Sequence, residues 1–278
     1  MGPWSPLESF VSVQLANDPS FTLKWKRAYH HFSQAQAVIA KFLNSHEEKP
    51  YEVTQDQGSE PGKLLVWLTL RKEPPDVSLA VGDSIHNARS ALDHIVYAIS
   101  SRQEPNPTFT AFPIQTVEAH WDRGAKRGKL AKSSGEYQTR LLPAPAREII
   151  KELQPWPGRN PPHLDRERLE LLHKLDIADK HKKLNLLVTY LQLAAYGARL
   201  GEAEAAPPLE YFSPTVTLQL NTPILLFRFA DPKVLVQPIP RLDITLTEGG
   251  RREVPVVRQL NEILDCVRRV LGQLEVFI

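Results

Sequence analysis

The sequence contains very little cysteine: of its 278 residues, Cys266 is the only one. A single thiol cannot form an intramolecular disulfide, so no disulfide framework stabilises the fold. No run of 18 consecutive apolar residues is present, which excludes a hydrophobic membrane-spanning helix. The first residues lack a basic segment followed by an apolar one, so no secretory signal peptide is predicted. These absences predict a soluble, cytoplasmic protein that does not bind a membrane.

An excess of charge of either sign is also absent. The chain has 34 Lys and Arg residues against 32 Asp and Glu, a net charge of +2. No field of the whole molecule therefore directs it to nucleic acid, and such binding must come from a local patch. The stretch HWDRGAKRGKLAKSSGEYQTR, residues 120–140, holds six basic and two acidic residues with Gly and Ser between them. It is typical of a flexible, solvated loop, and its residues 121–140 are the candidate RNA-binding segment.

Apolar residues at helical spacing are the main signal along the chain. They predict long helices over residues 20–48, 77–101, 164–183 and 254–275. Proline-containing breakers such as PNP and PWPG interrupt residues 102–163, which are predicted to form loops with one short helix near 144–154.

Shorter runs rich in β-branched and aromatic residues predict strands. The first two, 51–56 and 63–71, flank the turn sequence GSEPG and form a hairpin. Four further runs lie between 208 and 248, separated by Pro, Asn and Asp. The stretch LNLLVTYLQLAAY, 184–196, either continues the preceding helix or begins a strand, and its Leu, Val, Thr and Tyr content favours a strand.

These elements predict an α+β fold. The four long helices are expected to pack together and against an antiparallel sheet that combines the 51–71 hairpin with strands from 208–248. A single domain over residues 1–278 is expected. An alternative boundary lies near 200–208, where GEAEAAPP has the composition of a linker.

The predicted helix 77–101 carries an unusual polar side. On a helical wheel its polar residues fall within one arc of about 160°, and apolar residues fill the rest. The polar set contains neither Lys nor Glu, the usual residues of a solvated helix face. Short or rigid hydrogen-bonding groups suit a buried network or a cleft, so we expect this side to be covered. The set comprises Asp83, His86, Asn87, Arg89, Ser90, Asp93, His94 and Tyr97.

A second polar cluster lies in HKLDIADKHK, residues 173–182. On a continuous helix one face carries His173, Asp176, Asp179 and Lys180. His181 points away from that face and joins it only if the helix ends there. Apolar residues precede the cluster on the same face, which indicates that it points inward. We therefore expect the two clusters to meet, with Arg89 close to Asp176.

Two kinds of chemistry follow from these residue types. His and Asp are common metal ligands, but His86 and His94 are separated by about 12 Å along a helix axis, too far for one ion bonded at about 2.1 Å. A metal site would need one of them with His173 and Asp176, and no metal or other cofactor is predicted. Ser90 and His94 are spaced i, i+4, as a nucleophile and its base would be, but no G-x-S-x-G sequence surrounds Ser90.

The segment RSALDH, residues 89–94, resembles the R-x4-H motif of the HEPN superfamily, helical ribonucleases of bacterial toxin and defence systems. The similarity covers about one helix. It implies metal-independent RNA cleavage in which His94 acts as acid or base on the 2′-hydroxyl or the leaving oxygen and Arg89 stabilises the phosphate. Asp93 is grouped with them as a candidate catalytic residue. The family often has Asn, Asp or His after the arginine, whereas this chain has Ser90.

The same resemblance implies a homodimer, because the family usually acts at a cleft between two copies of the domain. More broadly, the order G-D-x-x-H-N-x-R-S-x-L-D-H, F-P-I and D-K-H-K is similar to that of an uncharacterised bacterial family. That resemblance spans most of the chain and implies no activity. Three interpretations follow: a buried polar cluster that is structural or binds a ligand or partner, a HEPN-like ribonuclease, and a metal-dependent hydrolase.

Overall fold

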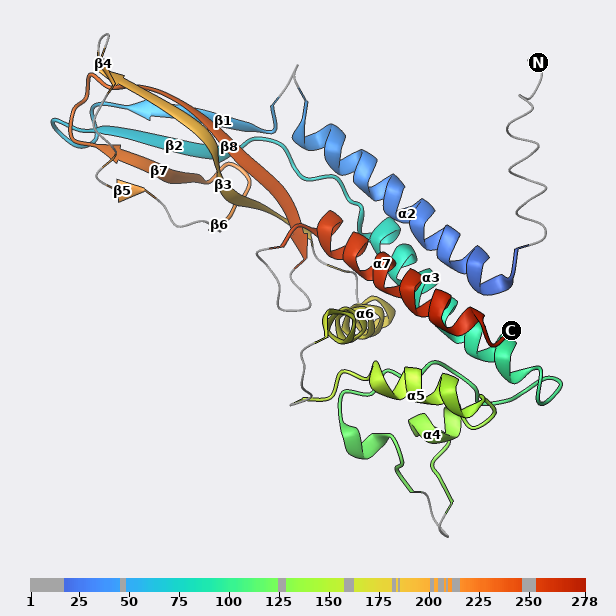
Figure 1. The fold of residues 1–278 in the computed structure, drawn as a ribbon. Helices are drawn as coiled ribbons and strands as arrows, with labels where there is room; N and C mark the ends of the chain where they lie inside the picture. Colours follow the sequence, from blue (N-terminus) through green and yellow to red (C-terminus); the bar gives the residue numbers. More distant parts are fainter. Residues whose placement is uncertain are drawn as a thin grey trace, which may run out of the picture. The chain divides into compact units, whose positions relative to one another are not determined.

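The chain has an α+β fold, as predicted (Figure 1). The computed structural model describes residues 18–45, 49–124, 129–157, 163–181, 184, 186–200, 203–204, 208, 210–211, 216–246 and 254–278. Contacts divide the chain into two compact units. The first contains residues up to 34, 79–183 and 258–278, and the second contains 35–78 and 184–257. The linker-like stretch 200–208 lies within the range of the second unit, and whether the chain folds as a single domain stays a prediction.

Helices build the first unit. The long ones are α2 (Ser20–Leu43), whose first part belongs to this unit, α3 (Ser78–Ser100), α6 (Leu164–His181) and α7 (Val256–Glu275). The shorter ones are η1 (Glu118–His120), α4 (Gly135–Gln138) and α5 (Ala144–Glu152). All four predicted long helices and the short helix near 144–154 are confirmed. The predicted ends at 46–48 and 182–183 lie outside the described residues.

The core of this unit contains the apolar side of α3, as its periodicity predicts. Eight residues of that side are at most 1% exposed: Val81, Ile85, Ala88, Ala91, Leu92, Ile95, Val96 and Ile99. Burying a side chain of this size contributes about 1.5–3 kcal/mol relative to leaving it in water. The same core includes Cys266 of α7, which is 1% exposed. Burial raises the pKa of its thiol, so Cys266 behaves as a core residue.

Two antiparallel sheets build the second unit. The first has the order β1-β2-β7-β5 and joins the predicted hairpin to later strands. It comprises β1 (Tyr51–Asp56), β2 (Leu64–Leu70), β7 (Pro223–Phe229) and β5 (Glu210–Tyr211). The second sheet has the order β4-β3-β6, with β8 also paired to β3. It comprises β3 (Leu186–Leu200), β4 (Ala203–Glu204), β6 (Val216–Thr217) and β8 (Leu235–Leu246). The strand interpretation of 184–196 is therefore confirmed.

One predicted break within the second sheet is wrong. The runs 233–239 and 241–248 were expected to be separate strands, but β8 is continuous through Pro238 and Pro240. Pairing with β3 continues at both prolines, and a register irregularity lies opposite them between Leu193 and Ala195. Proline lacks the N–H of a ladder hydrogen bond, and strands accept it at bulges and at sheet edges. The irregular register accounts for the continuous strand.

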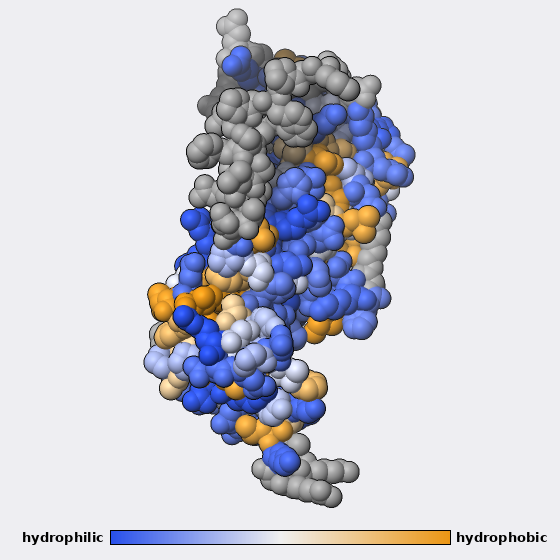
Figure 2. Space-filling view, turned by 90° about the vertical axis from the view of Figure 1, so that its right-hand side faces the viewer, coloured by the Kyte–Doolittle hydropathy of each residue, from blue (hydrophilic) through white to orange (hydrophobic). Residues whose placement is uncertain are grey.

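None of the helices in the described part of the chain combines the length and the apolar character needed to cross a membrane. On the face drawn in Figure 2, hydrophobic residues are interspersed with hydrophilic ones.

Candidate functional site

The two predicted polar clusters meet where α6 approaches α3. At the first turns of α3, Gly82 makes room for Asp179: a Cβ atom at position 82 would lie 2.2 Å from Asp179 Oδ1. One turn further along α3, His86 Nδ1 lies 3.6 Å from Asp176 Oδ1. The expectation that residues 173–182 supply partners for the polar side of α3 is confirmed by these contacts, and we call the assembled residues of α3 and α6 the α3–α6 cluster.

Asp176 is the buried centre of this cluster. Its side chain is 5% exposed, and Oδ2 accepts a hydrogen bond from Lys180 Nζ at 2.6 Å. Oδ1 accepts no hydrogen bond from any residue that the structure describes. The 3.6 Å separation from His86 Nδ1 exceeds hydrogen-bond length, although it is short enough for an ion pair when the imidazole is protonated. A buried carboxylate oxygen without a donor is unfavourable, which makes Oδ1 the feature to explain.

The polar side of α3 is less covered than the sequence indicated. Asp83, His86 and Tyr97 are exposed, and the side chain of His86 retains 54% of its accessible surface. The other members are intermediate in exposure: Asn87, Arg89, Ser90, Asp93 and His94. The expectation of full burial is wrong for the exposed three, because α6 covers α3 at Gly82 and Asp179 while its cluster residues Lys180 and His181 remain exposed. The cluster is open to solvent on one side.

Arg89 takes partners other than Asp176. Its Nη2 donates to the carbonyl oxygen of Phe112 at 2.7 Å, and its Nη1 lies 2.9 Å from Asp93 Oδ1. The same Asp93 oxygen accepts the backbone N–H of Phe112 at 2.9 Å. Asp93 lies one helical turn after Arg89 and therefore on the same side of α3. Among the described residues Arg89 does not pair directly with Asp176; Arg89 and Asp93 instead form a clamp on the Phe112 backbone.

The charges of Arg89 and of Asp176 both act on the pKa of His173. Burial lowers the pKa of His173, and the positive charge of Arg89 lowers it further, while the carboxylate of Asp176 acts in the opposite direction. The net direction is downward, so the imidazole is held in its neutral form more strongly than a solvated histidine.

Three carboxylates lie close together at one end of the cluster: the exposed Asp83, the partly exposed Asp179 and the buried Asp176. Burial raises the pKa of Asp179, and the charges of Asp176 and Asp83 raise it further, against the opposing effects of His86 and Lys180. Like charges in a partly desolvated site favour the protonated form of one member. This end of the cluster therefore carries an excess of negative potential.

Two residues of α2 that sequence reasoning missed also face the polar side of α3. Lys24 Nζ donates to Asn87 Oδ1 at 3.5 Å, and His31 Nδ1 lies 3.9 Å from Asp83 Oδ2. Burial and the charge of Lys24 lower the pKa of His94, while the charge of Asp93 acts in the opposite direction. The signal was present in the sequence, since positions 24 and 31 are seven apart and so share one helix face. Nothing in that spacing identifies α3 as the neighbour.

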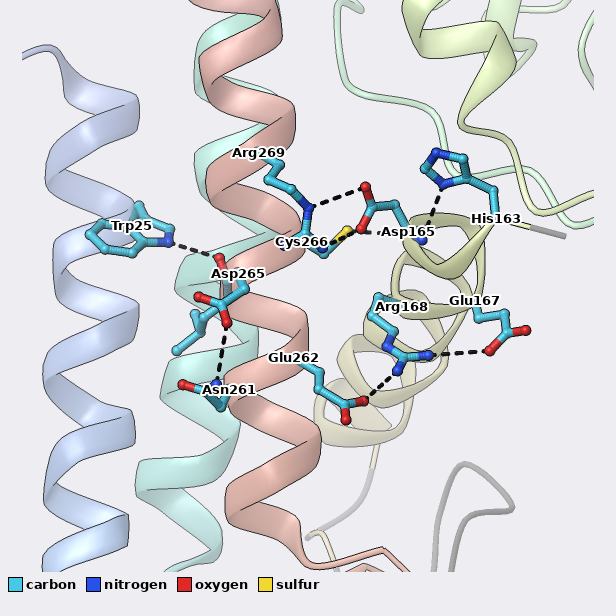
Figure 3. Close-up of polar contacts among 11 residues, drawn as sticks. Trp25, His163, Asp165, Glu167, Arg168, Asn261, Glu262, Asp265, Cys266 and Arg269 are labelled. Carbon is cyan, nitrogen blue, oxygen red and sulfur yellow. Dashed lines mark hydrogen bonds and ion pairs between the residues drawn. The ribbon is translucent and has the colours of Figure 1, made fainter.

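Polar contacts with α7 hold α6 in place (Figure 3). Asp165, in the first turn of α6, accepts hydrogen bonds from Arg269 Nε at 3.3 Å and from Arg269 Nη2. Arg168 forms an ion pair with Glu262 at 2.6 Å. The Cys266 thiol donates to the Asp165 carbonyl oxygen at 3.6 Å. These contacts fix the helix that carries Asp176 and Asp179.

The predicted basic loop contains a short helix, α4, and includes buried residues. Trp121 is 8% exposed and packs on Gly135, where a Cβ atom would lie 2.3 Å from the indole ring. The interpretation of 121–140 as a wholly solvated loop is therefore wrong, because the indole and α4 pack together. Residues 125–128, which include Lys126 and Arg127, lie outside the described residues.

Metal binding finds no support in the side-chain geometry: within the described ranges, no group of three or more His, Cys, Asp or Glu residues is arranged to hold an ion. Comparisons with protein families, with curated proteins and with solved structures each find no match for this chain.

Proposed function

We propose that the α3–α6 cluster binds a small ligand carrying a primary amine, which reaches the buried Asp176 from the side of the cluster that is open to solvent. The observation that carries this proposal is the Oδ1 atom of Asp176, which sits on a side chain that is 5% exposed and accepts no hydrogen bond from the described residues. A ligand N–H would supply the missing donor. A charge-assisted hydrogen bond of this kind contributes about 1.5–3 kcal/mol.

The local charges favour a cationic ligand over a neutral one. Asp83 and Asp176 both raise the pKa of Asp179, and Lys180 is the cation paired with Asp176. An ammonium group placed between these carboxylates relieves their mutual repulsion. His86, half-exposed at 3.6 Å from Asp176, borders the same position.

Putrescine is the test probe, with 1,4-butanediol as an uncharged probe of the same chain length. By calorimetric titration at low ionic strength and neutral pH, we expect putrescine to bind the wild-type chain and butanediol to bind much more weakly. Asp176→Asn keeps the size of the side chain but removes its charge. We expect it to weaken putrescine binding at least about ten-fold, because the charge-assisted hydrogen bond is lost.

Glu170→Gln is the matched control. Glu170 lies on the same helix and forms an i, i+4 ion pair with Lys174 at 2.6 Å, the same spacing and distance as Asp176 with Lys180. This variant should bind putrescine like the wild type. Equal binding by wild type and Asp176→Asn, or equal binding of the diol and the diamine, would refute the proposal.

A second candidate function is metal-independent RNA cleavage, and Lys24 favours it. This lysine donates to Asn87 and, together with burial, lowers the pKa of His94. A neutral imidazole beside an ammonium group suits a general base acting next to a phosphate. The role of Arg89 differs from the one that the HEPN resemblance implies, since its guanidinium is engaged with the Phe112 carbonyl oxygen and Asp93.

His94→Gln tests this activity on a fluorescently labelled single-stranded RNA in the presence of EDTA. If His94 is the base, we expect the variant to cleave at least about 100-fold more slowly, the usual contribution of a general acid or base. His120→Gln, at an exposed histidine of η1, is the control and should cleave normally. Cleavage by His94→Gln at the wild-type rate would rule out this mechanism.

A further inference from the structure

Phe109 is an exposed aromatic residue in the segment between α3 and η1. Its side chain is 56% exposed, and its backbone has a φ of 56°. A bulky residue rarely adopts this left-handed region, because its Cβ atom is crowded by the backbone. An exposed ring that is held in an unfavourable conformation contributes little to the core. Residues of this kind concentrate at binding sites.

One cation lies over the ring, and a second lies beside the preceding residue. Lys132 Nζ lies 3.8 Å from the centroid of the Phe109 ring. Arg140 donates to the Thr108 carbonyl oxygen at 3.0 Å, and its guanidinium carbon lies 4.2 Å from the Tyr137 ring centroid. Arg140 therefore links the residue before Phe109 to α4. Lys132 lies over the Phe109 ring, and Phe109 as a residue nevertheless stays 56% exposed.

We propose that Phe109, Lys132 and Arg140 form a stacking platform for single-stranded nucleic acid. A base stacks on an exposed aromatic ring regardless of its sequence, and nearby lysine and arginine attract the adjoining phosphates. Charge complementarity supports this partner, because the described part of residues 120–140 contains Arg123, Lys129, Lys132 and Arg140 against Asp122 and Glu136. The platform is separate from the amine site proposed above and does not depend on it.

The platform lies close to the clamped backbone of Phe112. Phe112 is the third residue after Phe109, so their Cα atoms are at most about 11 Å apart. Arg89 and Asp93 hold both backbone polar groups of Phe112. The clamp therefore fixes one end of the segment that presents the ring.

Phe109→Gly provides a sharp test, because it removes the ring and also suits the left-handed backbone. The measurement is fluorescence anisotropy at low salt with labelled 12-nucleotide oligouridylate and oligothymidylate. We expect the wild type to bind, and Phe109→Gly to bind about ten-fold more weakly, as loss of a base–aromatic stack does. Its melting temperature should be unchanged or higher. A merely structural role of Phe109 would instead lower the melting temperature. Phe109→Trp should retain binding.

Lys132→Ala tests the phosphate contact, and Lys233→Ala, at an exposed lysine of the second unit, is its control. We expect Lys132→Ala to reduce the magnitude of the slope of log affinity against log salt by about 1, and Lys233→Ala to leave it unchanged. Asp176→Asn should bind both oligonucleotides like the wild type, which separates this surface from the amine site. Wild-type affinity in Phe109→Gly, no binding by the wild type, or equal losses in the two lysine variants would overturn the proposal.

Discussion

Arg89→Ala is expected to lower the free energy of unfolding by about 2–4 kcal/mol, since it removes two charge-assisted contacts of a largely buried guanidinium. The Arg89 side chain is 16% exposed and binds both the Phe112 carbonyl oxygen and Asp93. Its loss leaves Asp93, 37% exposed, without its ion-pair partner. Urea denaturation followed by circular dichroism measures the change.

His94→Ala is the control for this prediction, because His94 lies on the same polar side of α3 without a part in the clamp. It should change the free energy of unfolding much less than Arg89→Ala. The double variant Arg89→Ala/Asp93→Ala should lose less unfolding free energy than the sum of the losses in the two single variants, because both residues hold Phe112. A fully stable Arg89→Ala variant that no longer cleaves RNA would contradict the structural role and support the catalytic role that the HEPN resemblance implies.

Periodicity made the helices and their buried sides predictable. The apolar side of α3 follows from spacing alone, because Ile85, Ala88 and Leu92 recur at helical intervals and each is at most 1% exposed. The hairpin of β1 and β2 follows from strand propensity and a turn sequence. The continuity of β8 does not follow, since proline usually interrupts a strand and only the pairing with β3 shows an irregular register opposite it.

The sequence predicted which side chains of the candidate site share a face of one helix, but not how the helices are paired. A helical wheel identifies which residues of α3 share a face, but it does not reveal which other helix lies beside that face. For this reason Lys24 and His31 were missed, and Arg89 was assigned to Asp176 in place of Asp93. Exposure was misjudged for the same reason: the absence of Lys and Glu indicates a covered face, yet Asp83 and His86 are exposed and lie 3.9 and 3.6 Å from His31 and Asp176.

Arg269→Ala is expected to lower the free energy of unfolding at neutral pH by about 3–5 kcal/mol, as much as Arg89→Ala or more. The reason is that it leaves a buried carboxylate without its partner. The Asp165 side chain is 8% exposed, whereas that of Arg269 is 53% exposed. The reverse change, Asp165→Ala, leaves only a solvated guanidinium and should be milder. Equal losses in the two variants would contradict this asymmetry. Because Asp165 anchors the first turn of α6, Arg269→Ala should also weaken putrescine binding at Asp176 on the same helix.

The effect of Arg269→Ala should depend on pH, with a sign set by Asp165. Burial alone would raise the pKa of Asp165, but the hydrogen bonds and charge of Arg269 more than offset it and leave that pKa below its ordinary value. The ion pair therefore stabilises the fold above the ordinary carboxyl pKa of about 3.9, and its contribution is lost as the pH falls through the lowered pKa of the folded state. In the variant, the carboxylate escapes its unpaired state by taking up a proton in acid. Urea denaturation at neutral pH and near pH 3 should show that the loss of unfolding free energy in Arg269→Ala, relative to the wild type, is smaller in acid. A loss that is constant across this range would show that Arg269 acts through packing of its aliphatic stem and not through its charge.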